Sequence, residues 1–200
     1  SYDQTNQRWN YSPTGSFEAP LLFVGPGQIN FQMPPEISAG DSVPAQLRQA
    51  SGNTLLATIR VATAAPGIFT VLLSGRGQGA VLNQDHSQNG DPQTMLGARP
   101  AARGSIIQIF GTGAGATIPA LPAGQPAVAS GNPLVLTQAQ PTLTIGGIPA
   151  RVLFSGMAPG FVGVWQINAE VPAAVTPGSA VPLLVMAEGV VSNTVTIAVE

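Results

Sequence analysis

The sequence predicts an all-β protein of two tandem β-sandwich domains, related by internal duplication, with the N-terminal domain incomplete. Residues 27–34 (GQINFQMP) recur as residues 165–172 (WQINAEVP), and the match continues at the same offset from 40–61 to 178–199. A match held in register over about forty residues indicates a duplicated structural unit. The 24 Gly and 19 Pro residues divide the apolar residues into short runs. No segment longer than ten residues shows helical periodicity without Gly or Pro inside it.

The first copy is expected to form four short strands in two hairpins. Gly and Pro at 25–27 supply a turn after a short apolar run, and the following strand alternates polar and apolar residues. A second hairpin is expected to reverse about Ser51, Gly52 and Asn53. The expected strands cover residues 21–24, 28–33, 43–48 and 55–61.

The second copy is expected to be a fuller sandwich. Strands spaced by about 8–12 residues, with turn residues between them, are typical of sandwiches. The Gly-rich stretches at 75–79 and 111–115 match neither phosphate-binding fingerprint, so we interpret them as turns. The expected strands cover or lie near residues 105–110, 134–145, 150–155, 161–170, 180–187 and 193–199.

The two copies differ in what precedes them. The second has two strands' worth of sequence, residues 104–145, before its strand at 151–154, whereas only 1–20 precede the first strand of the first copy. The first sandwich is therefore expected to leave a sheet edge open. The arm, a neighbouring copy or sequence outside this chain could complete it. The expected division is an arm or edge strand at 1–18, a first repeat at 19–75, a connecting segment at 76–102 and a second domain at 103–200.

Composition excludes several classes of function. Charged residues make up 8% of the chain, the net charge is −2 and no Lys is present, so nucleic acid is not an expected partner. Without Cys there is no disulfide framework or thiolate metal site. No apolar run reaches the roughly 18 residues of a membrane helix, so no membrane insertion is expected. An uncharged surface rich in Thr, Ser, Gln and Asn favours a secreted or cell-surface location.

Residues 1–18 are rich in aromatic residues set among Gln, Asn, Ser and Thr. One interpretation is a mobile chain terminus. The other is a contact arm or edge strand, because large amphipathic rings are typical of contact surfaces. Residues 10–12 also match a glycosylation sequon. The candidate assembly residues are Tyr2, Trp9, Tyr11, Phe17, Leu21, Leu22 and Phe23.

No catalytic site is expected. His86 is the single histidine, and its neighbours Asp85 and Ser87 are too close in sequence to form a triad, whose members converge from separate segments. Too few His and Cys residues are present for a site that needs two of them. Asp85, Asn89 and Asp91 lack the spacing of a calcium loop, so we interpret their segment as a solvated loop.

The remaining acidic residues and Trp165 also have structural interpretations. Glu170 and Glu188 are expected on exposed strand faces, and no carboxylate pair suggests glycoside hydrolysis. Trp165 lies inside an alternating strand and is expected in the core rather than on a sugar-binding platform. We therefore expect no enzymatic activity and no cofactor or metal.

A series of motifs resembles one family. They are LF at 22–23, PGQIN at 26–30, APGIF at 65–69, GQGA at 77–80, NQD at 83–85, PAARGS at 100–105, GVWQIN at 163–168 and SNTVTI at 192–197. This order resembles the uncharacterised C-terminal domain family of acidobacterial (Solibacter-type) secreted proteins, from about Pro20 onward. The resemblance implies an extracellular Ig-like (IPT/TIG-like) β module without assigned catalytic residues. Residues 1–18 depart from the family, whose members are expected to carry more of the first repeat upstream.

The leading functional hypothesis is a non-enzymatic extracellular structural protein, a filament or cell-surface subunit. Strand complementation would join its copies head to tail, with residues 1–18 as donor and 21–61 as acceptor. The alternative is an Ig-like module of a larger secreted protein, a hydrolase or adhesin, that recognises polysaccharide. A third hypothesis is a terminal sorting domain for a secretion machine.

Overall fold

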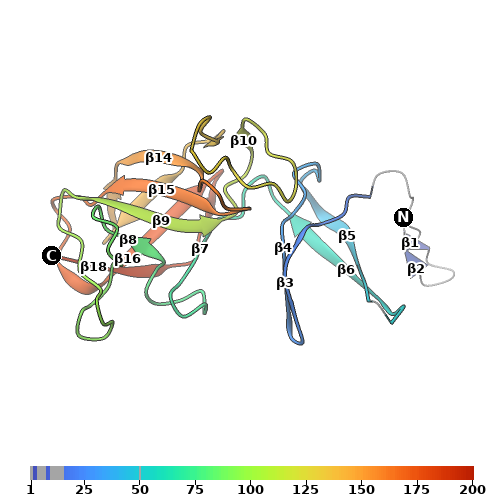
Figure 1. Cartoon of the computed structure of the whole chain (residues 1–200), viewed down its shortest axis with the longest axis horizontal. Helices are drawn as coiled ribbons and strands as arrows, with labels where there is room; N and C mark the ends of the chain where they lie inside the picture. Colours follow the sequence, from blue (N-terminus) through green and yellow to red (C-terminus); the bar gives the residue numbers. More distant parts are fainter. Residues whose placement is uncertain (1, 4–7, 10–15, 50) are drawn as a thin grey trace.

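The computed structural model describes residues 2–3, 8–9, 16–49 and 51–200. Every regular element among them is a β-strand, which confirms the all-β prediction. None of the described residues forms a helix long and apolar enough to span a bilayer. Figure 1 shows a two-sheet sandwich (residues 64–200), a front unit of two hairpins (residues 19–61) and a short N-terminal strand pair beyond the front unit.

The strands are short, between two and ten residues long. In chain order they are β1 (Tyr2–Asp3), β2 (Arg8–Trp9), β3 (Leu21–Gly25), β4 (Gln28–Phe31), β5 (Gly40–Arg48), β6 (Thr54–Val61), β7 (Gly67–Ile68), β8 (Val81–Leu82), β9 (Ile106–Thr112), β10 (Thr117–Ile118), β11 (Leu136–Thr137), β12 (Thr142–Ile145), β13 (Ile148–Ala150), β14 (Val152–Met157), β15 (Trp165–Glu170), β16 (Gly178–Ala187), β17 (Val190–Val191) and β18 (Val195–Val199).

The sandwich packs two antiparallel sheets around one core. The larger sheet has the order β10-β11-β14-β15-β9-β7, with β8 also paired to β9. The smaller has the order β13-β12-β16-β17, with β18 also paired to β16. Side chains alternate across each strand, and the inward ones, such as Ile107 and Ile167 of the larger sheet and Leu183 and Ile197 of the smaller, are at most 2% exposed.

Residues 62–102 differ from the expected organisation. They were divided between the first repeat and a connecting segment, but β7 and β8 both pair with β9 of the sandwich. Asn193 fixes the start of this segment, because its side chain accepts from the Ile68 N–H (2.7 Å) and donates to the Ile68 carbonyl (3.0 Å). The amide of Asn193 thus acts as a strand partner for β7, a pairing that sequence periodicity does not reveal.

The Gly-rich stretch 111–115 has a packing role. A Cβ on Gly111 would lie 2.6 Å from the Gly67 carbonyl oxygen, and one on Gly113 would overlap the Ala65 carbonyl. Gly113 also has a φ of 75°, which side-chain-bearing residues rarely adopt. These glycines therefore let the end of β9 lie directly against the backbone that leads into β7, which corrects the simple turn interpretation.

The front unit consists of two separate two-stranded sheets, β3-β4 and β5-β6. All four expected strands form, and the second hairpin reverses near Gly52, where φ is 89°. However, β4 ends at Phe31 rather than at residue 33, and β5 begins at Gly40 rather than at residue 43. Among its described residues only Pro34 is buried, whereas the sandwich has a continuous core. The front unit touches the sandwich at Gln32, whose side-chain oxygen accepts from the Gly124 N–H (2.7 Å).

Candidate strand-accepting surface

The two strands of the second front hairpin pair as β16 and β18 do in the sandwich. Adding 138 to each residue of the first four β5-β6 pairs gives a β16-β18 pair, and the register shift falls in the same place. The corresponding pairs are Gly40↔Val61 with Gly178↔Val199, Val43↔Ile59 with Val181↔Ile197, Pro44↔Thr58 with Pro182↔Thr196, and Ala45↔Ala57 with Leu183↔Val195.

The first front hairpin pairs as β14 and β15 do. The pairs Leu21↔Phe31, Phe23↔Asn30, Val24↔Ile29 and Gly25↔Gln28 correspond to Val152↔Ala169, Phe154↔Asn168, Ser155↔Ile167 and Gly156↔Gln166, again with the register shift in the same place. Local contacts agree as well. The Gln28 amide donates to Asn30 Oδ1 (2.6 Å), and the Gln166 amide donates to Asn168 Oδ1 (2.9 Å).

Within the part of the chain that the structure describes, the front unit lacks two neighbouring strands that the sandwich has. In the sandwich, β15 pairs with β9, and β16 pairs with β12 through residues 183–186. Among the described residues, β4 pairs with β3 alone and β5 with β6 alone. The edge of β4 and the edge of β5, at 45–48, are therefore open where the sandwich is closed.

The backbone groups at the edge of β4 can be assigned from hydrogen bonds. The Gln32 N–H donates to the Pro20 carbonyl (3.0 Å), as the Glu170 N–H does to the Arg151 carbonyl (3.0 Å), so even-numbered residues of β4 bond to β3. Because bonding direction alternates along an antiparallel strand, Ile29 and Phe31 point their N–H and C=O groups at the open edge. A donor strand can bond there without disrupting the hairpin.

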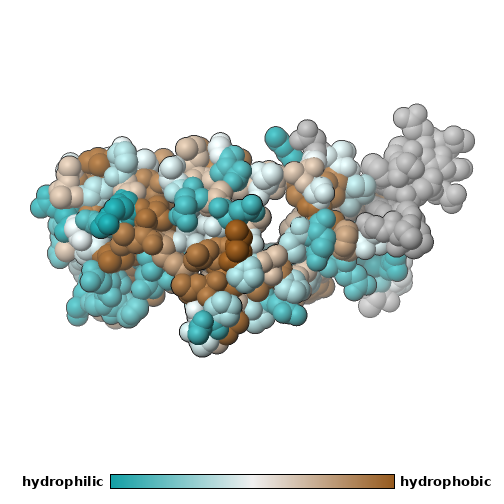
Figure 2. Space-filling model, turned by 90° about the horizontal axis from the view of Figure 1, so that it is seen from above, coloured by the Kyte–Doolittle hydropathy of each residue, from teal (hydrophilic) through white to brown (hydrophobic). Residues whose placement is uncertain are grey.

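Apolar side chains on the inner face of the front unit are not sealed from solvent. Ile29 and Val43 are half-buried, whereas their counterparts Ile167 and Val181 are 2% and 7% exposed. Phe31 is 46% exposed, although its counterpart Ala169 is fully buried. Figure 2 shows hydrophobic patches on the sandwich as well as on the front unit, so exposure alone does not single out the front unit. What distinguishes the front unit is that Ile29, Phe31 and Val43 are open to solvent, whereas the corresponding positions of the sandwich are buried.

The predicted assembly residues divide into three groups. Phe17, Leu21, Leu22 and Phe23 are about half exposed on or next to the front unit. Tyr2 and Trp9 form the backbone pair of β1 and β2, and Tyr11 lies outside the described residues. Sequence analysis missed the inner face, whose members are Ile29, Phe31, Val43, Leu47, Leu55 and Ile59. The alternation of β4 and β5 was the available signal.

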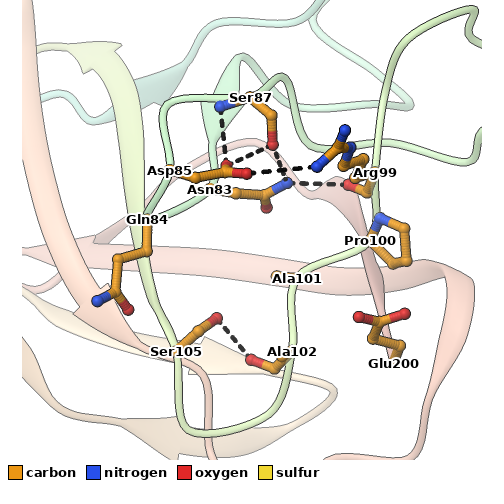
Figure 3. Close-up of a pocket in the computed structure, with 10 residues that line it drawn as sticks. All are labelled: Asn83, Gln84, Asp85, Ser87, Arg99, Pro100, Ala101, Ala102, Ser105 and Glu200. Atoms are coloured by element: carbon orange, nitrogen blue, oxygen red, sulfur yellow. Dashed lines mark hydrogen bonds and ion pairs between the residues drawn. The ribbon is translucent and has the colours of Figure 1, made fainter.

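A second candidate, an open pocket of about 350 Å³, lies where the 83–105 segment meets the end of the chain. Figure 3 shows Asp85 and Glu200 on different sides of it, with Ser105 bonded to the Ala102 carbonyl. Sequence analysis did not bring Asp85 and Glu200 together, because they are far apart in the chain. The other lining residues are Asn83, Gln84, Ser87, Arg99, Pro100, Ala101, Ala102 and Ser105.

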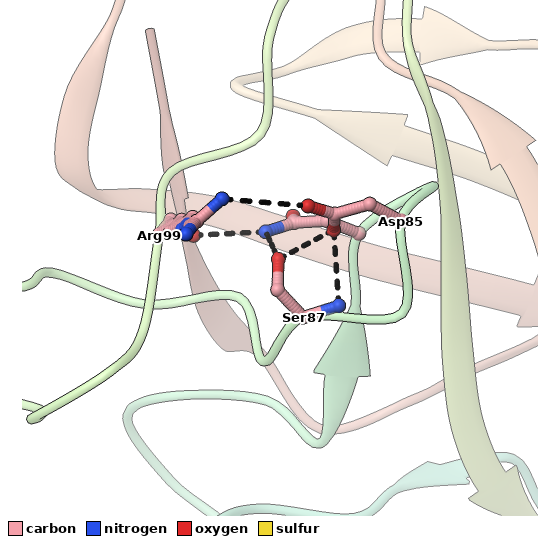
Figure 4. A network of polar contacts seen from close by, with 4 residues as sticks. Asp85, Ser87 and Arg99 are labelled. Atoms are coloured by element: carbon pink, nitrogen blue, oxygen red, sulfur yellow. Dashed lines mark hydrogen bonds and ion pairs between the residues drawn. The ribbon is translucent and has the colours of Figure 1, made fainter.

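Asp85 is held ionised by its own loop. Hydrogen bonds from the Ser87 hydroxyl (2.6 Å) and the Ser87 N–H (3.0 Å) lower the pKa of Asp85, and Arg99 at 3.7 Å adds a smaller effect in the same direction. Figure 4 shows this network. A general acid needs a pKa near the working pH, so Asp85 is poorly placed for that role. The exposed pair with Arg99 contributes little stability.

The other chemistry-bearing residues form separate structural contacts. The His86 ring lies 3.3 Å from the Gln108 amide. The Ser87 hydroxyl donates directly to Asp85 (2.6 Å), so the His86 ring does not stand between the two as it would in a triad. Asp91 accepts from the Gln93 N–H (2.9 Å) and closes a local turn. Across the described ranges, no three His, Cys, Asp or Glu side chains converge as metal ligands. Glu170 is bound by Arg151 (2.6 Å), which directly precedes the neighbouring strand β14.

Asn89, one of the residues considered for a cation, is fully buried and completes the edge of β18. Its side-chain amide donates to the Ala198 carbonyl and accepts from the Ala198 N–H, both at 2.9 Å. It also donates to Asn83 Oδ1 (3.0 Å). Asn89 is therefore a side-chain substitute for a strand, and all of its amide groups are occupied.

Replacing Asn89 by Ala is expected to lower the free energy of unfolding by about 1–3 kcal/mol, because it leaves the buried Ala198 N–H without a partner. The Ala198 carbonyl keeps its hydrogen bond from the Ala101 N–H (2.9 Å). Urea denaturation followed by tryptophan fluorescence measures the change. The control is Asn53→Ala in the exposed β5-β6 turn, expected to stay within about 0.5 kcal/mol. Equal losses in the two variants would show that Asn89 has no special role.

A scan against protein-family models finds no match to this chain. Searches of curated proteins and of solved structures find none either.

Proposed function

We propose that this protein is a non-enzymatic structural subunit that assembles by β-strand complementation between copies. The observation that carries the proposal is the front unit, whose strands repeat the register of the sandwich but lack the neighbours of β15 and β16. An open edge with half-buried apolar side chains is the kind of surface that strand addition completes. The matched registers support two Ig-like units related by duplication.

Residues 1–18 are the proposed donor and the front unit the acceptor. Figure 1 places β1 and β2 beyond the front unit, at the far end from the sandwich, so these two strands lie away from the core of their own chain. In the described residues β1 pairs with β2 and with no strand of the front unit. Donation from one copy to the front unit of the next is a head-to-tail contact, which propagates as a filament. The proposed location is extracellular or on the cell surface.

Deleting residues 1–17 is expected to leave the chain monomeric. The deletion removes the proposed donor, and the sandwich, whose core begins at Ala64, should stay folded. Analytical ultracentrifugation and electron microscopy of the native chain and the deletion, at matched concentration, measure assembly. Circular dichroism checks that the deleted chain keeps its fold.

A pair of substitutions tests whether assembly depends on the aromatic side chains of the arm or only on its length. Trp9→Ser with Tyr11→Ser is expected to weaken assembly, whereas the control Gln4→Ser with Gln7→Ser is expected to preserve it. Filaments that form normally after the deletion would remove the arm from the proposal.

One observation favours the alternative function, a polysaccharide-binding module. Trp165 is 2% exposed and so belongs to the core, as predicted, but Phe161 is 59% exposed on the loop before β15. Exposed rings can stack on sugars, and binding of the monomer to a glycan array would favour this function. Binding that requires Phe161 but not Phe31 would separate it from assembly.

A further inference from the structure

We propose that the open edge of β4 receives a single antiparallel β-strand in the register in which β9 pairs with β15, donated by a second copy of this chain. We call the open edge of β4 the slot. The source of the strand rests on the proposed function, whereas the slot and its register rest on the internal comparison of the front unit with the sandwich. In the sandwich, Ile167 lies opposite Ile109, and Ala169 opposite Ile107. The same register places donor residues opposite Ile29 and Phe31.

The hydrogen-bonding pattern sets the direction of the donor. Strand β9 runs antiparallel to β15. Just beyond the ends of both strands, the Val171 N–H donates to the Ser105 carbonyl (2.9 Å) and the Val171 carbonyl accepts from the Gly104 N–H (2.8 Å), so odd-numbered residues face this side. Ile29 and Phe31 present the equivalent groups, so a strand that runs antiparallel to β4 can bond to both. Asn30 then lies in a non-hydrogen-bonded pair, as Asn168 does opposite Gln108.

The interior of the front unit also indicates the size of the donor side chains. Ala45 lies opposite Ala57, where the sandwich has the fully buried pair Leu183 and Val195. The two Ala side chains fill less space than Leu183 and Val195 do, and a well-packed interior needs that space filled. The donor is therefore expected to carry bulky apolar side chains at alternate positions. Trp9 and Tyr11 of the arm have this spacing in the sequence.

A cysteine cross-link tests the slot without requiring the chain to assemble. The chain has no native Cys, so an introduced thiol is unique. The probe is a synthetic peptide with the sequence of residues 104–112, carrying Cys in place of Gln108, and it is added in excess to the full-length Asn30→Cys variant. In the β9 register these Cα atoms are about 4.5 Å apart, within disulfide range, whereas a partner two residues away is about 7–8 Å distant.

The matched control is Gln28→Cys, two residues along the same strand and likewise exposed. We expect at least about tenfold more cross-link at position 30 than at position 28. A second peptide, with Cys in place of Phe110, should reverse the preference, because 28 then faces the peptide thiol. Cross-linking that does not distinguish the two positions, or does not occur with either peptide, would overturn the slot.

Failure of the proposed slot and failure of the proposed assembly between copies give different results. If the chain is monomeric at every concentration but the peptides link in register, the slot is supported and the donation by a second copy is overturned. If filaments form but the peptides do not link, the slot is overturned and assembly uses another surface.

Discussion

The Phe31→Asp variant is expected to remain monomeric at concentrations at which the native chain assembles. Phe31 is 46% exposed in the single chain, so nearly half of this residue remains for a donor strand to cover. In the assembly, the donor strand would cover this position, and the variant would lose the burial of the exposed part of the ring. That loss is about 1 kcal/mol, because burying a fully exposed Phe side chain contributes about 1.5–3 kcal/mol. It would also have to desolvate a carboxylate without a partner. Together these effects should raise the concentration needed for assembly by about 100-fold or more.

Asn30→Asp is the matched control for Phe31→Asp. It adds the same charge to the next residue of β4, but on the opposite face, where the Asn30 side-chain oxygen already accepts from Gln28. Sedimentation velocity over a concentration series compares the two variants. Assembly that is weakened equally by both would point to a general charge effect and contradict the face-specific contact.

Replacing Trp165 by Ala is expected to give the largest loss of stability in the sandwich. The ring is 2% exposed in the core, and its indole N–H donates to the Ser155 hydroxyl (2.9 Å), which also accepts from Thr137 (2.8 Å). Removing a buried Trp side chain costs about 3–5 kcal/mol, because a cavity remains. The midpoint of thermal unfolding should fall by about 8–15 °C.

Phe161→Ala is the aromatic control for the Trp165 substitution. Phe161 is 59% exposed, so its removal is expected to change the free energy of unfolding by less than about 0.5 kcal/mol. Urea denaturation followed by circular dichroism suits both variants, since it does not depend on the deleted fluorophore. A small effect at Trp165 would mean that the ring is not a main component of the core.

The sequence alone determined the local structure and the repetition. Period-two alternation and Gly-Pro turns predicted β3, β4 and the β5-β6 hairpin, and the offset of 138 residues identified segments that pair in the same register. The core position of Trp165 followed from its place in an alternating strand. These features are local, because each depends on a few neighbouring residues or on a direct match between two segments.

The tertiary structure decided which strands are neighbours and which faces are sealed. Alternation shows that β4 has an apolar face but not that Ile29 stays half-buried while Ile167 is enclosed. Likewise, residues 62–102 join the sandwich through Asn89 and Asn193, whose amides pair with distant backbone groups. Such contacts depend on long-range pairing, which is set by burial across the whole fold and leaves no periodic signal in the chain.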